Sequence, residues 1–184
     1  MNIKVLVTGC AGEIAISIAE ILRENFSAYE VFGCDIQPRE SFIRNFVETF
    51  LISPAGSTTW KQEILAIIEQ NEIDLIIPTV ERELIQLSEM FPEDDRIIIQ
   101  PKEILQVCLD KYKTHNFLVN KGIRVAHTEL LKNSVLTNDR KIVKPRSGRG
   151  SKGLKITNSK EDLEVLKTQL EGSAWVCQEL LLPV

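Results

Sequence analysis

Residues 141–156 read Lys141-Ile142-Val143-Lys144-Pro145-Arg146-Ser147-Gly148-Arg149-Gly150-Ser151-Lys152-Gly153-Leu154-Lys155-Ile156. Alternating segments at residues 141–144 and 154–157 flank a loop of glycines, serines and cations, which predicts a β-hairpin with a flexible tip. Residues 140–160 include eight Lys or Arg and no acid, although the chain has a net charge of −4. Glycines let backbone N–H groups approach phosphate oxygens and cations offset their charge, so the pattern suits a loop that closes over a polyphosphate. The simpler alternative is a solvated basic hairpin.

The composition is that of an ordinary globular chain. Its 184 residues, 43% of them hydrophobic and 26% charged, suffice for one large domain or for one domain and part of another. Mild acidity argues against general nucleic-acid binding. The sequence contains no apolar run long enough for a transmembrane helix and no signal-peptide pattern. We therefore expect a cytoplasmic protein with neither nucleic-acid nor membrane partners.

The cysteines and histidines show no pattern typical of metal binding. Four cysteines are widely spaced among apolar residues and form no CxxC pair: Cys10, Cys34, Cys108 and Cys177. The two histidines, His115 and His127, have no ligand spacing. We expect four buried free thiols, without a catalytic cysteine or a metal site in these residues.

The first hundred residues alternate between strand and helix patterns. Strands are expected at residues 3–7, 31–34, 47–52, 74–77 and 96–99, and the intervening helices end near residues 25, 70 and 91. Apolar strands joined by helices predict an open parallel sheet covered on both faces, with right-handed crossovers.

A glycine turn follows the first expected strand. Gly9 and Gly12 form this turn, and Asp35 lies about twenty residues later, where dinucleotide-binding folds place the acid that binds a ribose hydroxyl. An NAD(P)-binding epimerase- or dehydrogenase-like protein is therefore one alternative. However, the spacing is not GxGxxG, and neither Tyr29 nor Tyr112 has the lysine four residues later that a short-chain dehydrogenase uses. A tight strand-to-helix turn explains the glycines more simply.

Polar residues follow the fourth expected strand at its carboxyl end, where open α/β sheets bind ligands. Thr79, Glu81 and Glu83 are therefore candidates for a substrate crevice. The alternative is ordinary helix-start chemistry, with Thr79 as the N-cap and the two acids in the first turn.

The pattern changes class after residue 108, where we place the domain boundary. Asp110 suits the N-cap of a helix. Lys111 in the first turn is unfavourable against the helix dipole, which suggests that it serves an anionic partner, and the simpler alternative is a solvated lysine. The basic hairpin, a helix with a capping box at residues 159–162 and a strand at residues 175–182 follow. These elements predict a small antiparallel sheet with a helix on one face.

The order and spacing of these motifs resemble the ATP-grasp superfamily. The motifs are Pro78-Thr79 with Arg82-Glu83-Leu84, Asp110-Lys111 with Thr114, Lys144-Pro145 with the loop of residues 147–153, and Gln178-Glu179. The resemblance is closest to the large subunit of carbamoyl-phosphate synthase and related carboxylate–amine ligases. It implies an α/β fold: a Rossmann-like pre-ATP-grasp domain at residues 1–108, then the first half of an α+β ATP-grasp domain at residues 109–184.

The resemblance also implies an ATP site. Lys111 and Lys144 match the two cations that contact the phosphates, and the hairpin loop matches the flexible loop over the β- and γ-phosphates. The strand from residue 179 to residue 182 matches the segment that lines the adenine, and the alternative for Glu179 is a structural acid. The implied ATP-binding residues are Lys111, Lys144, Arg149, Gly150, Ser151, Glu179, Leu180, Leu181 and Leu182.

The chemistry implied by the family starts with phosphorylation of a small carboxylate by ATP, and an amine or ammonia then attacks the acyl phosphate. Mg²⁺ neutralises charge during such transfers, and the family's Mg²⁺-binding acids lie on later strands. We therefore assign no catalytic or metal-binding residue and expect an N-terminal fragment that is inactive alone. The alternative is a non-catalytic nucleotide-binding or subunit-interaction module, completed by another chain at the free edge of the last strand. A homodimer of this chain is also compatible with the sequence.

Overall fold

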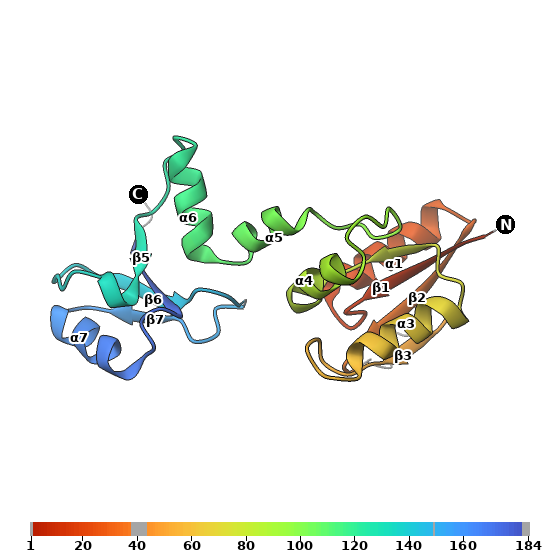
Figure 1. Ribbon diagram of the computed structural model, residues 1–184, viewed down its shortest axis with the longest axis horizontal. Coiled ribbons are helices and arrows are strands. Elements are labelled where there is room, and N and C mark those ends of the chain that lie inside the picture. The colour runs from red at the N-terminus through yellow and green to blue at the C-terminus, as the bar shows by residue number, and fades with distance from the viewer. Residues whose placement is uncertain (1, 38–43, 149, 182–184) are drawn as a thin grey trace. The chain divides into compact units, whose positions relative to one another are not determined.

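A computed structural model of the chain describes residues 2–37, 44–148 and 150–181. The chain divides into two compact units, Met1–Lys102 and Glu103–Val184, and each has its own sheet (Figure 1). The sequence placed the domain boundary six residues later, between residues 108 and 109.

The first unit is a parallel α/β fold. In the described residues its sheet has four strands in the order β3-β2-β1-β4, all parallel. The elements are β1 (Ile3–Thr8), α1 (Glu13–Asn25), β2 (Tyr29–Asp35), β3 (Thr49–Leu51), α3 (Trp60–Gln70), β4 (Leu75–Ile77) and α4 (Glu81–Met90). This strand order is that of Rossmann-type sheets, so the predicted fold class is confirmed for this region.

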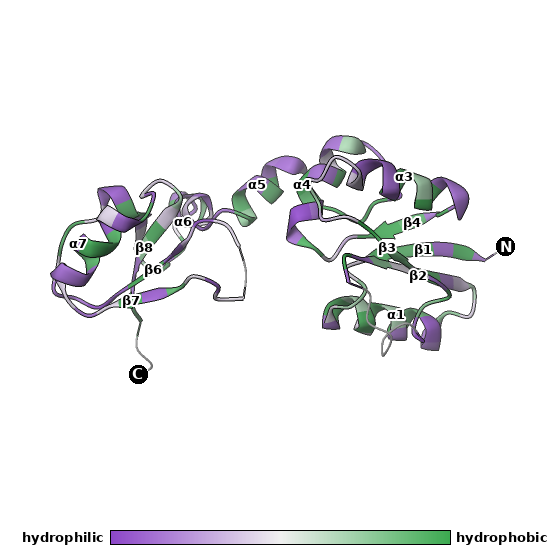
Figure 2. Cartoon of the chain, turned by 90° about the horizontal axis from the view of Figure 1, so that it is seen from below, coloured by the Kyte–Doolittle hydropathy of each residue, from purple (hydrophilic) through white to green (hydrophobic). Residues whose placement is uncertain are grey.

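Helices cover both faces of the parallel sheet, with α1 on one face and α3 and α4 on the other (Figure 2). Successive side chains of a strand point to opposite faces, and β1 serves both cores in this way. Leu6 belongs to the core that contains Trp60 of α3, whereas Val7 belongs to the core that contains Ala15 and Ala19 of α1. Burial on both sides explains the continuous apolar strand.

The fifth strand expected at residues 96–99 is wrong as a strand. In the described residues this segment forms an isolated parallel bridge between Ile97 and Ile76 of β4. Ile76 donates its N–H to the carbonyl of Arg96 (2.7 Å) and accepts from the N–H of Ile98 (2.9 Å). The N–H of Arg96 donates to the Asp94 carboxylate instead (3.0 Å). Next to this local turn, the pairing of the segment with β4 is a single bridge.

The turn after β1 requires glycine at position 9. Gly9 has φ +66°, and a Cβ there would lie 2.6 Å from Cγ2 of Val80 and 2.8 Å from Oγ1 of Thr79. Thr79 fixes this approach by donating its hydroxyl to the carbonyl of Thr8 (2.7 Å). The expectation that Thr79 caps α4 is wrong, because the N-cap is Val80 without a side-chain hydrogen bond. Thr79 instead ties the start of α4 to the end of β1.

We expect Gly9→Ala to lower the free energy of unfolding of the first unit by about 3 kcal/mol. A left-handed residue with a Cβ costs about 1–2 kcal/mol, and overpacking adds about 1–3 kcal/mol. Urea unfolding, followed by Trp60 fluorescence in a Trp175→Phe background, measures the effect. Gly12→Ala is the matched control, because Gly12 has a negative φ (−89°) and a Cβ there would lie 3.2 Å from the carbonyl oxygen of Gly9, a milder approach than the 2.6 Å at Gly9. Equal losses in the two variants would contradict the close-approach argument.

The second unit is built on an antiparallel sheet in the order β5-β8-β6-β7. Its elements are α5 (Lys102–Cys108), α6 (Lys111–Asn120), β5 (Thr128–Leu130), the 3-10 helix η1 (Leu131–Asn133), β6 (Lys141–Pro145), β7 (Lys155–Thr157), α7 (Lys160–Gln169) and β8 (Trp175–Glu179). The predicted hairpin is confirmed as β6 and β7. Leu163 of α7 packs against Val143 and Cys177 on one face of the sheet.

The prediction that the last strand lies at a sheet edge is wrong. β8 lies between β5 and β6 and pairs antiparallel with both. The edge position is instead taken by β5, a strand of three residues that the sequence did not indicate. Residues 175–179 therefore offer no free strand edge to another chain.

The cysteines are free, as expected, but one of the four is not buried. Cys10, Cys34 and Cys177 are buried, whereas Cys108, at the end of the short helix α5, is exposed. Burial, and then the nearby charge of Asp35, raises the pKa of Cys10 to about 12. Because the thiolate is the reactive form, this thiol is unsuited to nucleophilic chemistry at neutral pH.

In the part of the chain that the structure describes, we find no helix long and apolar enough to span a membrane.

Candidate functional site

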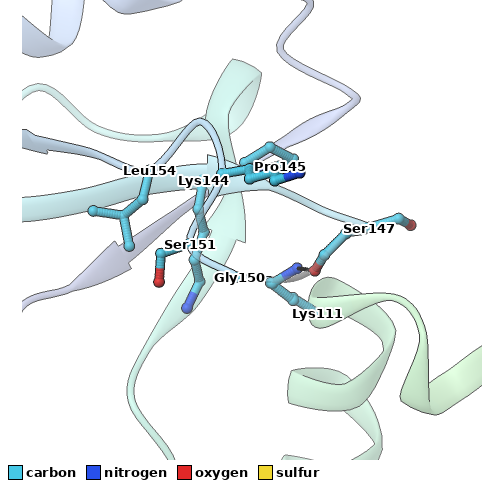
Figure 3. A pocket seen from close by; sticks show the side chains of 9 residues that line it. Lys111, Lys144, Pro145, Ser147, Gly150, Ser151 and Leu154 are labelled. Carbon is cyan, nitrogen blue, oxygen red and sulfur yellow. Dashed lines mark hydrogen bonds between the residues drawn. The ribbon is translucent and has the colours of Figure 1, made fainter. Parts of the chain in front are cut away.

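A cavity of about 270 Å³ lies beside the loop of the β6–β7 hairpin, within the second unit (Figure 3). Its lining consists of Lys111, Lys144, Pro145, Ser147, Gly148, Gly150, Ser151, Lys152 and Leu154. Among these described lining residues are three lysines and no acid. The cavity therefore has the charge and the hydroxyl groups of an anion-binding site.

Lys144 reaches the cavity from the end of β6. Its Nζ donates to Oε1 of Gln178 (2.6 Å), and its side chain extends to the same side of the hairpin as Ser151 (Figure 3). Partial burial, and then the charge of Lys111, lowers the pKa of Lys144. A bound anion would offset both effects, because it would compensate the lost solvation and the repulsion.

Lys111 is the first residue of α6 and faces the hairpin loop. Its Nζ donates to the carbonyl of Gly148 (2.9 Å), and its backbone N–H donates to the carbonyl of Arg146 (2.9 Å). These loop carbonyls hold a cation at a helix N-terminus, where the dipole alone would disfavour it. The backbone N–H groups of this helix end already donate to Arg146 and to the Asp110 carboxylate, so the group of α6 that suits a phosphate is the ammonium of Lys111.

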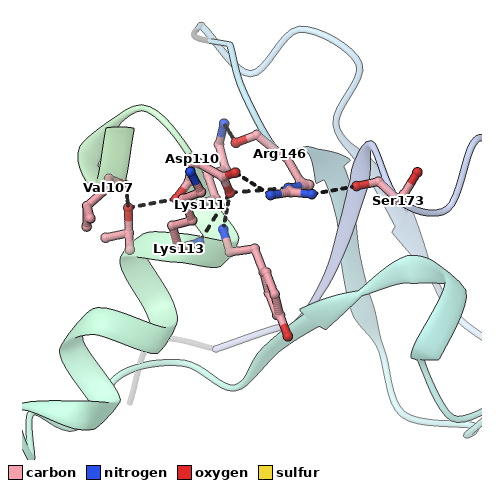
Figure 4. Close-up of polar contacts among 8 residues, drawn as sticks. Val107, Asp110, Lys111, Lys113, Arg146 and Ser173 are labelled. Carbon is pink, nitrogen blue, oxygen red and sulfur yellow. Dashed lines mark hydrogen bonds and ion pairs between the residues drawn. The ribbon is translucent and has the colours of Figure 1, made fainter. Parts of the chain in front are cut away.

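Asp110 connects α6 to the hairpin (Figure 4). Its carboxylate accepts from the backbone N–H groups of Tyr112 (2.9 Å) and Lys113 (3.2 Å), which confirms the predicted N-cap. It also forms an ion pair with Arg146, which donates to the carbonyl of Ser173 (3.0 Å). Burial opposes ionisation of Asp110, but hydrogen bonds from Arg146 and the backbone outweigh burial and lower its pKa. Sequence reasoning missed this ion pair.

The backbone of the hairpin loop is left-handed at several positions. Gly148, Gly150 and Gly153 have positive φ values, and Ser151 has φ +54°. Glycine adopts this conformation freely, whereas a residue with a Cβ loses about 1–2 kcal/mol. Strained backbone of this kind is found at ligand clamps. The strain at Ser151 is therefore consistent with a ligand-binding role for this loop.

Of the segment expected to line the adenine, the described residues Glu179, Leu180 and Leu181 are not among the residues that line the cavity. Glu179 donates its N–H to the carbonyl of His127 (3.0 Å), and its Oε1 accepts from the N–H of His127 (2.9 Å). Leu180 is half-buried and Leu181 is 67% exposed. Two further candidates lie outside the described residues: Arg149 and Leu182.

The candidates for the substrate crevice lie in the first unit, after the carboxyl end of β4. Thr79 bonds to Thr8 as described above, Glu81 is half-buried at the start of α4, and Glu83 is buried. They come together at the start of one helix, and their role in binding stays a prediction.

Asp35 supports the glycine turn from the end of β2. Its carboxylate accepts from the N–H of Ala11 (3.1 Å) and from the N–H of Gln37 (3.1 Å). These contacts give the acid a structural role in the turn, and they favour the simpler interpretation of the Gly9–Gly12 segment over the dinucleotide one.

Solved structures with similar folds match nearly the whole chain, including both units. The ADP complex of Staphylococcus aureus N5-carboxyaminoimidazole synthetase matches 98% of the chain with a TM-score of 0.78 and 18% identity. L-amino acid ligase from Bacillus licheniformis matches 98% of the chain, with a TM-score of 0.74 and 13% identity. The chain has the fold of the N-terminal portion of ATP-grasp enzymes.

A third structure with a similar fold is a carboxylase domain. The biotin carboxylase domain of Hydrogenobacter thermophilus 2-oxoglutarate carboxylase, in complex with MgADP, ADP and bicarbonate, matches 97% of the chain with a TM-score of 0.69 and 14% identity. The chain spans less than half of each of these three structures: 48%, 44% and 44% of their lengths. No family model and no curated protein matches the sequence significantly. The three similar structures confirm the predicted fold class.

Proposed function

We propose that this chain is the phosphate-binding part of an ATP-dependent ligase. The observation that carries the proposal is the cavity in which Lys111, Lys144 and the glycine loop converge without an acid in the lining. The fold supports it, because two of the similar structures contain ADP. Lysine acts as a point charge beside phosphate oxygens, and the loop N–H groups would add hydrogen bonds.

We propose that the full enzyme activates a carboxylate and joins it to an amine or ammonia. ATP would supply the phosphoryl group. The closer resemblance to carbamoyl-phosphate synthase rests on the order of the sequence motifs alone. The described lining residues are cationic, hydroxyl-bearing or apolar, and none of them offers the carboxylate oxygen that Mg²⁺ prefers in proteins. We also propose that the chain alone binds nucleotide without forming ADP from ATP, since it spans less than half of the similar enzymes.

Titration of the chain with MgADP tests the nucleotide proposal. We expect Lys144→Met to weaken binding by about 10- to 100-fold, because a hydrogen bond to a charged group is worth about 1.5–3 kcal/mol. Lys155→Met is the matched control, since Lys155 lies on β7 of the same hairpin, is exposed and is not a lining residue. Absence of MgADP binding, or an equal effect of the two substitutions, would refute the proposed site.

A further inference from the structure

A chain of side-chain hydrogen bonds crosses three strands of the second sheet and ends at Lys144. Lys144 Nζ on β6 donates to Oε1 of Gln178 on β8 (2.6 Å). Gln178 Nε2 donates to Oγ1 of Thr128 on β5 (2.8 Å). Thr128 Oγ1 donates to the carbonyl of Ala126 (3.0 Å). These three bonds form a relay from a buried hydroxyl to the cavity.

Strand register places the members of the relay on one face. Gln178 lies directly opposite Thr128 across the β5–β8 pair and opposite Ile142 across the β6–β8 pair. Lys144 lies two residues beyond Ile142, and alternate residues of a strand share a face. The helix α7 packs on the other face through Val143. The relay therefore lies on the side of the sheet that α7 leaves uncovered.

The direction of the relay is fixed by its buried end. The carbonyl of Ala126 can only accept, so the hydroxyl of Thr128 must donate to it and offer a lone pair to Gln178. The amide nitrogen of Gln178 satisfies that lone pair, which directs its oxygen toward Lys144. Thr128 is 3% exposed, so water cannot easily replace this partner.

We propose that Gln178 and Thr128 are positioning residues that aim the ammonium of Lys144 at a phosphate of the bound nucleotide. The inference rests on the proposed function. A lysine ammonium has three donors, and the bond to Gln178 uses one and leaves two for phosphate oxygens. A neutral amide also orients the ammonium without neutralising it. Asp110, by contrast, holds Arg146 with a full charge, and Arg146 does not line the cavity.

A pair of substitutions at Thr128 tests the relay. Thr128→Val removes the hydroxyl and leaves the amide of Gln178 free to turn, whereas Thr128→Ser keeps the hydroxyl. We expect Thr128→Val to weaken MgADP binding by about 3- to 10-fold, the range of one neutral hydrogen bond, and Thr128→Ser to bind like the wild type. Adenosine, which has no phosphate, should bind all three chains equally. Equal losses for adenosine and MgADP, or no loss in Thr128→Val, would overturn the inference.

A second measurement needs no nucleotide and separates this inference from the proposed function. The bond that the Lys144 ammonium donates to Gln178 stabilises the charged form of Lys144, so its loss should increase modification of Lys144 by an amine-reactive acylating reagent at fixed pH. We expect mass spectrometry to show an increase of about 3-fold or more in Gln178→Leu and Thr128→Val, relative to Lys155 in the same chain. Unchanged labelling would overturn the relay, whether or not MgADP binds. Increased labelling in a chain that binds no MgADP would support the relay's hold on Lys144 and refute the proposed function.

Discussion

Gly150→Asp is expected to abolish measurable MgADP binding, with a loss of more than about 100-fold. The substitution places a carboxylate in the lining that contains Lys111 and Lys144. Two like charges about 4 Å apart repel by about 4 kcal/mol near a protein surface, and the new carboxylate would also compete with phosphate for the lysines. The left-handed backbone of Gly150 (φ +64°) adds about 1–2 kcal/mol of strain, while among the described residues, the chain neighbours aside, no atom lies within 4 Å of a Cβ there.

Two further variants separate the causes of this loss. Gly150→Ala introduces the strain without the charge, so we expect it to lose less than about 10-fold in affinity. Gly12→Asp introduces the same side chain at the N-cap of α1, where φ is −89° and Asp is favoured, and MgADP binding should not change. NAD(P) binding that survives Gly150→Asp and is lost in Gly12→Asp would instead support a nicotinamide-dependent protein and contradict the proposal.

The sequence predicted the features of this site that depend on local patterns. Alternation at residues 141–144 and 154–157 indicated the hairpin because a strand with one covered face repeats every two residues. Asp110 was identifiable as an N-cap because its side chain bonds to N–H groups only two and three residues away. Lys111 and Lys144 were selected by motif order, and the structure brings both to one cavity.

The features that the sequence missed depend on contacts between distant residues. The strand β5 has only three residues, Thr128–Leu130, too few for a period to be visible, and its omission produced the wrong edge position for β8. The partners of Lys144 and Arg146 lie 34 and 36 positions away. Periodicity predicts which face a side chain occupies but not which neighbour it meets there, so neither the relay nor the Asp110 ion pair could be predicted.

The ion pair between Asp110 and Arg146 leads to the second large effect. We expect Asp110→Ala to lower the free energy of unfolding of the second unit by about 3 kcal/mol. Loss of an N-cap costs about 1 kcal/mol. Loss of the carboxylate also leaves the partly buried Arg146 without its charged partner, which adds about 2 kcal/mol, less than for a fully buried pair. Asp110→Asn keeps a good N-cap and should lose only the second part.

The charge of Asp110 makes this contribution depend on pH with a defined sign. Its pKa in the folded chain lies below the ordinary value of 3.8. The stabilisation is therefore fully present above that ordinary value and is lost as the pH falls through the folded pKa. Urea unfolding, followed by Trp175 fluorescence in a Trp60→Phe background, should show a constant gap between wild type and Asp110→Asn from about pH 5 to 8 and a shrinking gap below about pH 4. A gap at pH 3 as large as at pH 7 would mean that the loss in Asp110→Asn does not come from the charge of Asp110, and it would contradict the ion-pair argument.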